Sequence, residues 1–273
     1  MLDEEEQRLL YGHAYVPEHL KDYVEAVSGA EPFLHEDHLC LLRKGHLTFI
    51  GYALKKNRDT PGAYESAVKR FKPTSTGVIA PEIWFPPGSC DTRSRDSYYI
   101  LDLPLSPLPQ SLDYMVRRGG RELRVSEGRF GREHRKLVKA FLSRHELSPE
   151  QVRVFKRIAK VLERSRSARL IEARKGRALA AFHILDLGSA DFAFYLFAFR
   201  SRELPVPGVS DLLFYEMTRM ACAEGKRAMN LGLGINPGIR RFKEKWGGVP
   251  FLPCHTALIQ NRPADFGPMW KKL

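Results

Sequence analysis

The chain has 273 residues, 43% hydrophobic and 28% charged, a composition typical of a globular protein with one large domain or two small ones. It contains no run of about 18 apolar residues, which argues against a membrane-spanning helix. The formal net charge is +12 at pH 7, and a basic surface favours a polyanionic partner, such as nucleic acid, an anionic lipid or a phosphate-bearing ligand.

The start of the chain and its cysteines predict a cytoplasmic protein without a metal. The first residues, MLDEEEQRLL, are acidic where a secretory signal would be basic and then apolar. Four cysteines lie far apart without a CxxC pair, which favours reduced thiols over disulfides or a zinc site: Cys40, Cys90, Cys222 and Cys254. His35 and His38 lack a third nearby ligand, so we interpret them as part of a surface turn.

The positive charge is concentrated in one stretch. Residues 117–177 hold 20 lysines and arginines against 7 acidic residues, a net charge of +13. We expect this stretch to contact a polyanion, such as tRNA. The alternative is that it forms solvated helices that happen to be cationic.

The first part of the chain predicts strands around one helix. Residues 39–54 form two apolar strands about a Lys44-Gly45 turn. Residues 60–72 predict a helix with Thr60 as N-cap and Pro61 at its first position.

A proline-rich break then separates two halves. Before the break we predict strands at 76–84 and 97–105, with a turn-rich loop at 86–96 between them. After it we predict a short helix at 111–120, which glycine closes. Because residues 104–111 break regular structure, we place a domain boundary there, with domains at 1–110 and 111–273.

The second half predicts the order β-α-α-β-β-β-α-β-α-β. Its second helix opens with a capping box, Ser148 with Gln151. Tight turns join its three middle strands into an antiparallel meander. The segments are 121–128, 130–146, 148–165, 168–173, 177–187, 190–201, 210–225, 228–234, 237–246 and 249–260.

This order resembles the GNAT-type acyltransferase fold, and three stretches resemble its FemAB-like branch. They are SLDYMVRRGGRELRV, GVSDLLFYEMTRMACAEGKRAMNLGLG and GIRRFKEKWGG, the last with the branch's phenylalanine-lysine and glycine signature at Phe242-Lys243 and Gly247. The resemblance covers about residues 111–260, and residues 1–110 fit as a degenerate first unit. It implies an α+β fold of two tandem GNAT-like units, with mixed, mostly antiparallel sheets flanked by helices.

The basic helix at 237–246 carries the expected catalytic residue. Gly232 and Gly234 let the preceding strand end bend and expose its backbone to a ligand. In acyl transfer the reacting carbonyl develops negative charge, which a nearby cation stabilises. The resemblance places a functional lysine at Lys243. The alternative is a surface lysine on a cationic helix, with Asn236 only a cap and Trp246 a core anchor.

The expected donor site precedes the central helix. The resemblance implies that backbone N–H groups there bind the pyrophosphate of coenzyme A, although Pro205 and Pro207 remove two such donors. Asp211 would repel an anion there or cap the helix. FemAB-like proteins use aminoacyl-tRNA, so a coenzyme A thioester and aminoacyl-tRNA are both candidate donors. The candidate cofactor-binding residues are Phe199, Arg200, Ser201, Gly208, Val209, Ser210, Asn236, Arg240 and Arg241.

The sequence therefore predicts an N-acyltransferase that moves an acyl or aminoacyl group onto an amine. We expect direct attack, because no cysteine or serine has a paired base nearby in sequence. Glu172 and Glu216 are the candidate general bases, whereas His183 in mid-strand is interpreted as a packed core histidine. A non-catalytic module of the same fold that binds nucleic acid or a phosphate ligand is the alternative function.

Overall fold

The computed structural model describes residues 2–86, 88–90 and 92–261. Within them, eleven strands form one sheet, ordered β1-β2-β3-β4-β11-β5-β10-β9-β8-β7-β6. The strands are β1 (Glu31–His35), β2 (His38–Arg43), β3 (His46–Ile50), β4 (Ser75–Ala80), β5 (Thr92–Asp102), β6 (Arg124–Glu127), β7 (Ala168–Lys175), β8 (Ala178–Asp186), β9 (Phe192–Arg200), β10 (Ala228–Leu233) and β11 (Val249–Gln260).

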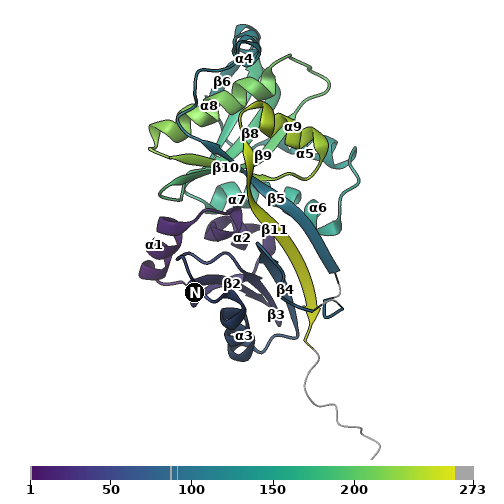
Figure 1. Cartoon of the computed structure of the whole chain (residues 1–273). Coiled ribbons are helices and arrows are strands. Elements are labelled where there is room, and N and C mark those ends of the chain that lie inside the picture. The colour runs from purple at the N-terminus through teal and green to yellow at the C-terminus, as the bar shows by residue number, and fades with distance from the viewer. Residues whose placement is uncertain (1, 87, 91, 262–273) are drawn as a thin grey trace, which may run out of the picture.

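Helices lie on both sides of this sheet (Figure 1). Those of the described residues are α1 (Glu4–His13), α2 (Lys21–Ser28), α3 (Thr60–Phe71), α4 (Gln110–Glu122), α5 (Arg132–Leu142), α6 (Pro149–Lys156), α7 (Ile158–Arg164), α8 (Val209–Ala223) and α9 (Pro237–Lys245), with a short 3-10 helix, η1 (Pro17–His19). The element order predicted for the second half is confirmed, except that its second helix is divided into α6 and α7.

Two long strands join the halves of the molecule into one sheet. β5 lies between β10 and β11, and β11 pairs with both β4 and β5. The neighbours are antiparallel apart from the parallel pairs β3–β4 and β9–β10. Figure 1 shows β5 and β11 running from the upper half into the lower half. The division at residue 110 stays a prediction.

β5 begins earlier than the sequence predicts. The loop expected at 86–96 includes residues 87 and 91, which lie outside the described residues, but residues 92–96 belong to the strand. The partner strand β11 explains the difference, because it continues alongside and pairs Arg95 with His255 and Asp96 with Cys254. Ladder hydrogen bonds to a distant strand outweigh a local turn preference here.

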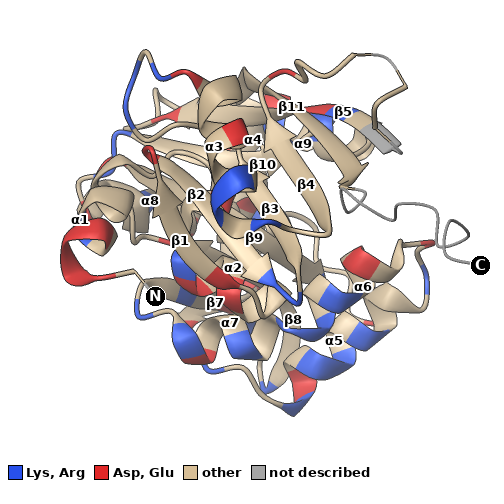
Figure 2. Cartoon of the chain, turned by 90° about the horizontal axis from the view of Figure 1, so that it is seen from below, with Lys and Arg blue, Asp and Glu red and all other residues tan. Residues whose placement is uncertain are grey.

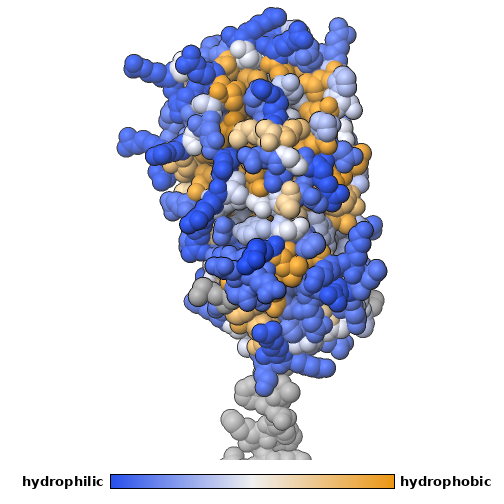
Figure 3. All heavy atoms as spheres, turned by 90° about the vertical axis from the view of Figure 1, so that its left-hand side faces the viewer, coloured by the Kyte–Doolittle hydropathy of each residue, from blue (hydrophilic) through white to orange (hydrophobic). Residues whose placement is uncertain are grey.

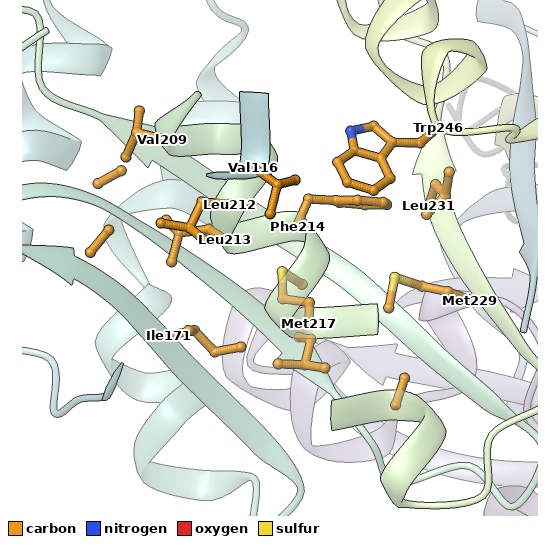
Figure 4. Close-up of a cluster of buried hydrophobic side chains, with 14 of the residues drawn as sticks. Val116, Ile171, Val209, Leu212, Leu213, Phe214, Met217, Met229, Leu231 and Trp246 are labelled. Carbon is orange, nitrogen blue, oxygen red and sulfur yellow. The ribbon is translucent and has the colours of Figure 1, made fainter. Parts of the chain in front are cut away.

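The core of the second half is packed on both faces of the sheet. On one face, α4 and α8 cover β7, β8 and β10 with apolar side chains such as Leu213, Phe214 and Met217 (Figure 4). On the other face, Val138 of α5 and Ile158 of α7 pack on Phe182 and neighbouring strand residues. Burial on both faces accounts for the nearly continuous apolar sequence of β8 and β9.

Helix boundaries confirm some local predictions and correct others. The capping box at Ser148 is present, since its Oγ accepts from the Gln151 N–H and the Gln151 side chain accepts in return. At α3 the N-cap is Asp59, whose carboxylate accepts from the Gly62 N–H, so the prediction of Thr60 was wrong by one residue. The α6–α7 break falls at Arg157, whose guanidinium donates to backbone carbonyls at the end of α2.

Glycine does not close α4 as predicted. The helix runs through Gly119 to Glu122, and Gly119 lies where α8 begins. A Cβ on Gly119 would be 3.1 Å from the carbonyl oxygen of Gly208, and one on Gly208 would be 2.1 Å from that of Met115. These glycines therefore allow two helix backbones to touch, and the position of α8 depends on that contact.

The surface agrees with this layered core. On the face shown in Figure 3, hydrophilic residues cover most of the area, and the apolar residues that reach it form small separate patches. No helix among the described residues has both the length and the apolarity needed to cross a membrane.

Candidate active site

Lys243 lies buried beneath α9. Its side chain points to the end of β10, where Nζ donates to the carbonyl oxygens of Gly232 at 2.9 Å and Leu233 at 2.6 Å. The residue is only 3% exposed, and Nζ is 5.5 Å from the centroid of the Tyr99 ring. The interpretation as a surface lysine is therefore wrong. A buried ammonium with backbone partners is held in one place.

Burial also changes the titration of this group. Desolvation lowers the pKa of Lys243 to about 7, while the negative charge of Asp96 opposes the change. An ammonium has three N–H donors, and two of them are bound to the carbonyls of Gly232 and Leu233. The third has no oxygen acceptor among the described residues, and Nζ lies over the ring of Tyr99.

The bend in β10 creates the place where Lys243 ends. β10 pairs with β9 only from Ala228 to Asn230, and its register with β5 shifts between Asn230 and Leu233. Gly232 has φ +74, a conformation that favours glycine, and its N–H donates to the Asn230 side chain. The predicted bend is thus present, and it turns two backbone carbonyls toward Lys243.

Helix α9 is fixed at both ends by polar contacts. Asn236 is its N-cap and accepts from the Ile239 N–H at 3.0 Å. At the other end, Trp246 is buried against Phe214, as predicted for a core anchor, and its Nε1 donates to Asp211 at 3.2 Å. Lys245 donates to the same carboxylate. Asp211 therefore links α8 to α9 and does not cap α8.

The candidate cofactor residues of α9 lie apart from its buried lysine. Arg240 and Arg241 are both exposed on the outer side of the helix, and the side chain of Asn236 is engaged in capping. These three residues can therefore contact only a ligand that approaches α9 from solvent.

A cavity of about 460 Å³ lies between α5, the adjoining ends of β8 and β9, and the loop before α8. Four candidate cofactor residues line it: Phe199, Arg200, Ser201 and Ser210. Its cationic lining residues are Lys136, Arg144, Arg200 and Arg202, with Glu133 and Glu203 as the acidic ones. Since Lys136 is paired with Glu203 at 3.3 Å, the remaining positive charge favours an anionic ligand.

The first turn of α8 contributes only partly to this cavity. Ser210 lines it, but Gly208 and Val209 are buried toward α4. The first amides of a helix have no partner within the helix and attract anions. The structure thus brings Ser210 together with the cations, and it uses Gly208 and Val209 for packing.

The two candidate bases lie away from Lys243 and from each other. Glu172 on β7 is buried, with Arg174 Nε 2.7 Å from Oε1 and His134 Nε2 2.9 Å from Oε2. Glu216 on α8 faces another groove, beside Leu123 and Met220, and pairs with Arg219. These pairs engage both carboxylates, so neither Glu172 nor Glu216 is well placed to remove a proton from an amine near Lys243.

His183 lines the cavity, which the sequence analysis did not predict. It is packed in mid-strand as expected, with 1% exposure, but it also lines the cavity beside α5. Its Nδ1 has no hydrogen-bond partner among the described residues. A polar residue in an otherwise apolar buried strand was the only available signal.

The basic stretch forms a surface next to this cavity. Figure 2 shows Lys and Arg repeated along α5 and α6. Several of these side chains are exposed and form no salt bridge among the described residues: Arg132, Arg135, Lys139, Arg153 and Lys156. We call these five residues the α5–α6 basic face. In the described part of the chain, no group of three or more His, Cys, Asp or Glu side chains could hold a metal ion.

Sequence comparison relates part of the chain to a known class of domain. Residues 114–244 match the family model described as the acetyltransferase (GNAT) domain. This stretch matches a GNAT domain, which supports the predicted resemblance to the GNAT superfamily. None of the curated proteins compared with the chain matches it in sequence.

Solved structures extend the likeness to nearly the whole chain. FemX shares the fold with a TM-score of 0.63 and 10% identity, over 93% of this chain and 96% of its own. The C-terminal domain of a putative lysylphosphatidylglycerol synthetase from Agrobacterium fabrum gives 0.61 and 14%, over 92% and 90%. A tandem GNAT protein from the clavulanic acid biosynthesis pathway gives 0.51 and 13%, over 84% and 79%. The predicted tandem GNAT-like fold is confirmed, and FemX is one of its structural neighbours.

Proposed function

We propose that the chain is an N-acyltransferase that transfers an acyl or aminoacyl group from an activated donor to an amine. The GNAT domain supports the reaction class. The observation that carries the proposal is Lys243, a buried ammonium with one N–H left over at the bend of β10.

Lys243 is the proposed catalytic residue. When an amine attacks the donor carbonyl, a new C–N bond forms and the carbonyl oxygen becomes an oxyanion. The free N–H of Lys243 then donates to that oxyanion, and the collapse of the intermediate expels the thiolate or alkoxide of the donor, which takes up the proton that the attacking amine loses. A preorganised donor in a site from which water is excluded contributes about 3–4 kcal/mol to such a barrier.

The proposed donor-binding site is the cavity beside α5. Arg144, Arg200 and Arg202 carry the positive charge for a phosphate group, and Ser210 lies at the start of α8. This combination favours an acyl donor that carries phosphate groups. Of the two candidate donors, the coenzyme A thioester is the smaller.

The α5–α6 basic face favours aminoacyl-tRNA as a second candidate donor. Its five exposed cations adjoin the cavity along α5, where Lys136, Leu137 and Ala140 are lining residues. Contacts from such cations to RNA phosphates release counterions and provide affinity without reading sequence.

One experiment tests the reaction and the donor together. The purified protein is incubated with a panel of amines and either acetyl-coenzyme A or a mixture of aminoacyl-tRNAs, and the acylated amine is measured by mass spectrometry. Acylated product that the wild type forms and Lys243→Met does not form supports the proposal. The donor that yields product shows whether the protein uses a coenzyme A thioester or aminoacyl-tRNA. Binding of either donor without any product would favour the non-catalytic phosphate- or nucleic-acid-binding module.

A further inference from the structure

β10 carries a buried amide at the point where the strand bends. Asn230 is 0% exposed and stands between the buried side chains of Met229 and Leu231. It is the last residue of β10 that pairs with β9, and the register with β5 shifts between Asn230 and Leu233. An amide buried among apolar side chains is unfavourable unless its hydrogen bonds are satisfied. The contacts of Asn230 therefore indicate why an asparagine occupies this position.

The amide of Asn230 is hydrogen-bonded at both ends. Its Oδ1 accepts from the Gly232 N–H at 2.8 Å, and its Nδ2 donates to the Tyr15 carbonyl oxygen at 2.8 Å. These partners determine the orientation of the amide, because a flipped amide would place donor against donor and acceptor against acceptor. Asn230 thus connects the bend of β10 to a residue 215 positions earlier in the chain.

The chain segment around Tyr15 is itself held in place. The Tyr15 hydroxyl donates to the Ala53 carbonyl at 3.0 Å, and its ring packs edge-on against the ring of Tyr52. The preceding carbonyl, that of Ala14, accepts from the Ser189 hydroxyl at 2.6 Å. Because this segment contacts residues of both halves of the molecule, its carbonyl groups offer a fixed attachment point for Asn230.

The bend at the other end of this connection holds Lys243. Gly232, whose N–H binds Asn230, accepts from Lys243 Nζ with its own carbonyl oxygen at 2.9 Å, and Leu233 accepts from Nζ at 2.6 Å. Two peptide planes meet at Gly232, where φ is +74. The Asn230 contact holds the first plane, so it restrains the direction of the second plane, which carries the carbonyl that Lys243 uses.

Asn230 acts on Lys243 through hydrogen bonds and adds no charge. The charged and titratable groups around Lys243 come from the neighbouring elements: Asp96 and Tyr99 of β5, Arg240 and Glu244 of α9, and Tyr195 of β9, whose carbonyl oxygen would be 3.8 Å from a Cβ on Gly232. β10 contributes backbone carbonyls to this set. Replacing Asn230 with another uncharged residue therefore changes the support of the bend and leaves these charges in place.

We propose that Asn230 is a positioning residue of the candidate active site, which anchors the β10 bend to the segment at Tyr15 and keeps the Gly232 and Leu233 carbonyls against Lys243. The inference rests on the proposed function, because it concerns the lysine assigned to the oxyanion. Displacing a catalytic group by about 1 Å can lower a rate by ~10²-fold. The contact between residues 15 and 230 therefore contributes to turnover without touching the substrate.

Two variants of Asn230 separate its two contacts. Asn230→Leu has a similar shape and removes both hydrogen bonds. Asn230→Thr keeps a hydroxyl that can accept from the N–H two residues further on, but its side chain is one bond shorter than the amide that reaches Tyr15. Because it retains a polar group in the strand, Asn230→Thr carries the test if Asn230→Leu does not fold.

Thr218→Val is the matched control. Thr218 lies on α8, is 1% exposed, and donates its hydroxyl to the Tyr215 carbonyl at 2.7 Å. The substitution thus removes a buried hydrogen bond between a side chain and the backbone at a position that does not touch the β10 bend. Thermal unfolding of all variants shows which samples are folded.

Two measurements report on Lys243. Steady-state kinetics gives turnover and the KM of the donor that yields product. NMR of protein that contains lysine labelled with ¹³C at Cε gives the pKa of Lys243, and the Lys243 resonance is identified by its absence from Lys243→Met. The NMR titration needs no turnover.

We expect Asn230→Leu to lower turnover by ~10-fold or more, with little change in the KM of the donor. The titration of Lys243 should move to lower pH, because its ammonium loses carbonyl acceptors that stabilise the charged form. Asn230→Thr should lie between the wild type and Asn230→Leu. Thr218→Val should lower the unfolding temperature and leave turnover and the titration unchanged.

The possible failures are distinguishable. Unchanged turnover and titration in the folded Asn230 variants, or equal changes in Thr218→Val, would overturn the inference while the proposed acyl transfer stands. A titration that moves toward the usual lysine pKa would also overturn it, because Asn230 would then keep water away from Lys243 rather than hold its carbonyls. If the wild type forms no acylated product, the proposed function fails and the inference with it, and the NMR titration tells this failure apart from loss of the contact.

Discussion

Lys243 combines burial, two backbone acceptors and one free N–H, which makes its substitution the most direct residue-scale test. We expect Lys243→Met to lower turnover by ~10²-fold or more, because the oxyanion loses its donor while the hydrophobic stem is retained. Lys243→Arg should rescue little, since a guanidinium fork does not reproduce a compact ammonium in that space. Steady-state kinetics with the productive donor provides the measurement.

Lys245 cannot serve as the control for this substitution, although it is exposed on the same helix. Lys245 donates to the buried carboxylate of Asp211, so its removal would disturb the contact between α8 and α9. Lys69, which is exposed on α3, is the better control. Equal losses of turnover in Lys243→Met and Lys69→Met would contradict the proposed catalytic role of Lys243.

The pKa of Lys243 predicts a pH dependence with a definite sign. Burial lowers this pKa to about 7, so the ammonium is present below that pH and is lost as the pH rises through it. The ratio of wild-type turnover to Lys243→Met turnover should therefore fall as the pH rises from 6 to 8. Using the ratio cancels the titration of the acceptor amine. A ratio that rises over this range would indicate that neutral Lys243 acts as a base.

Glu172 is predicted to be structural. Its carboxylate is buried with Arg174 and His134, so Glu172→Gln should lower the free energy of unfolding by about 1–3 kcal/mol, while turnover by the folded protein changes little. Urea unfolding and kinetics on the same samples measure both quantities. Glu127→Gln is the control, because that side chain is 57% exposed beside Arg169. Lost turnover at unchanged stability would restore Glu172 as a candidate base.

At the scale of elements, the contact between α4 and α8 determines where α8 begins. Gly208 has φ +81 and lies directly beneath the Met115 carbonyl. Gly208→Ala should therefore destabilise the protein by more than the about 1–2 kcal/mol expected for a left-handed alanine. Thermal and urea unfolding measure the effect.

A second glycine provides the matched control for this contact. Gly225 has φ +69, but a Cβ there would meet nothing within 4 Å. Gly225→Ala should show only the conformational effect, and the difference between the two variants isolates the steric contact with α4. Similar losses of stability in Gly208→Ala and Gly225→Ala would mean that α4 can shift away from α8 with little loss of free energy.

At the scale of the whole molecule, positive charge is gathered on one side of the second half (Figure 2). If the α5–α6 basic face binds a polyanion through about six phosphates, the affinity for tRNA should fall by ~10³-fold between 50 and 200 mM salt. Changing its five residues to glutamine should lower both the affinity and the salt slope. Filter binding at several salt concentrations measures them.

Cations of the first half serve as the control for that experiment. Lys56, Lys69 and Arg70 are exposed there, on α3 or the loop before it, and their replacement by glutamine should leave tRNA binding almost unchanged. Binding that does not depend on salt, or equal losses for the two sets of variants, would return the basic face to an ordinary solvated surface.

The sequence alone determined those features that depend on neighbours in the chain. The capping box at Ser148, the meander of β7, β8 and β9, and the helix–strand order of the second half are local, because apolar periodicity and turn residues specify them. The resemblance to GNAT proteins followed from the same order. It also directed attention to Lys243, although not to its environment.

Only the tertiary structure decided features that depend on residues far apart in the chain. Pairing with β11 extended β5 into a predicted loop, and contact with α8 let α4 continue through Gly119. Lys243 is buried because β10 bends beneath α9, and His183 reaches a cavity because α5 and the loop before α8 meet at its strand. Exposure and titration arise from such long-range packing, because desolvation depends on what surrounds a side chain in space.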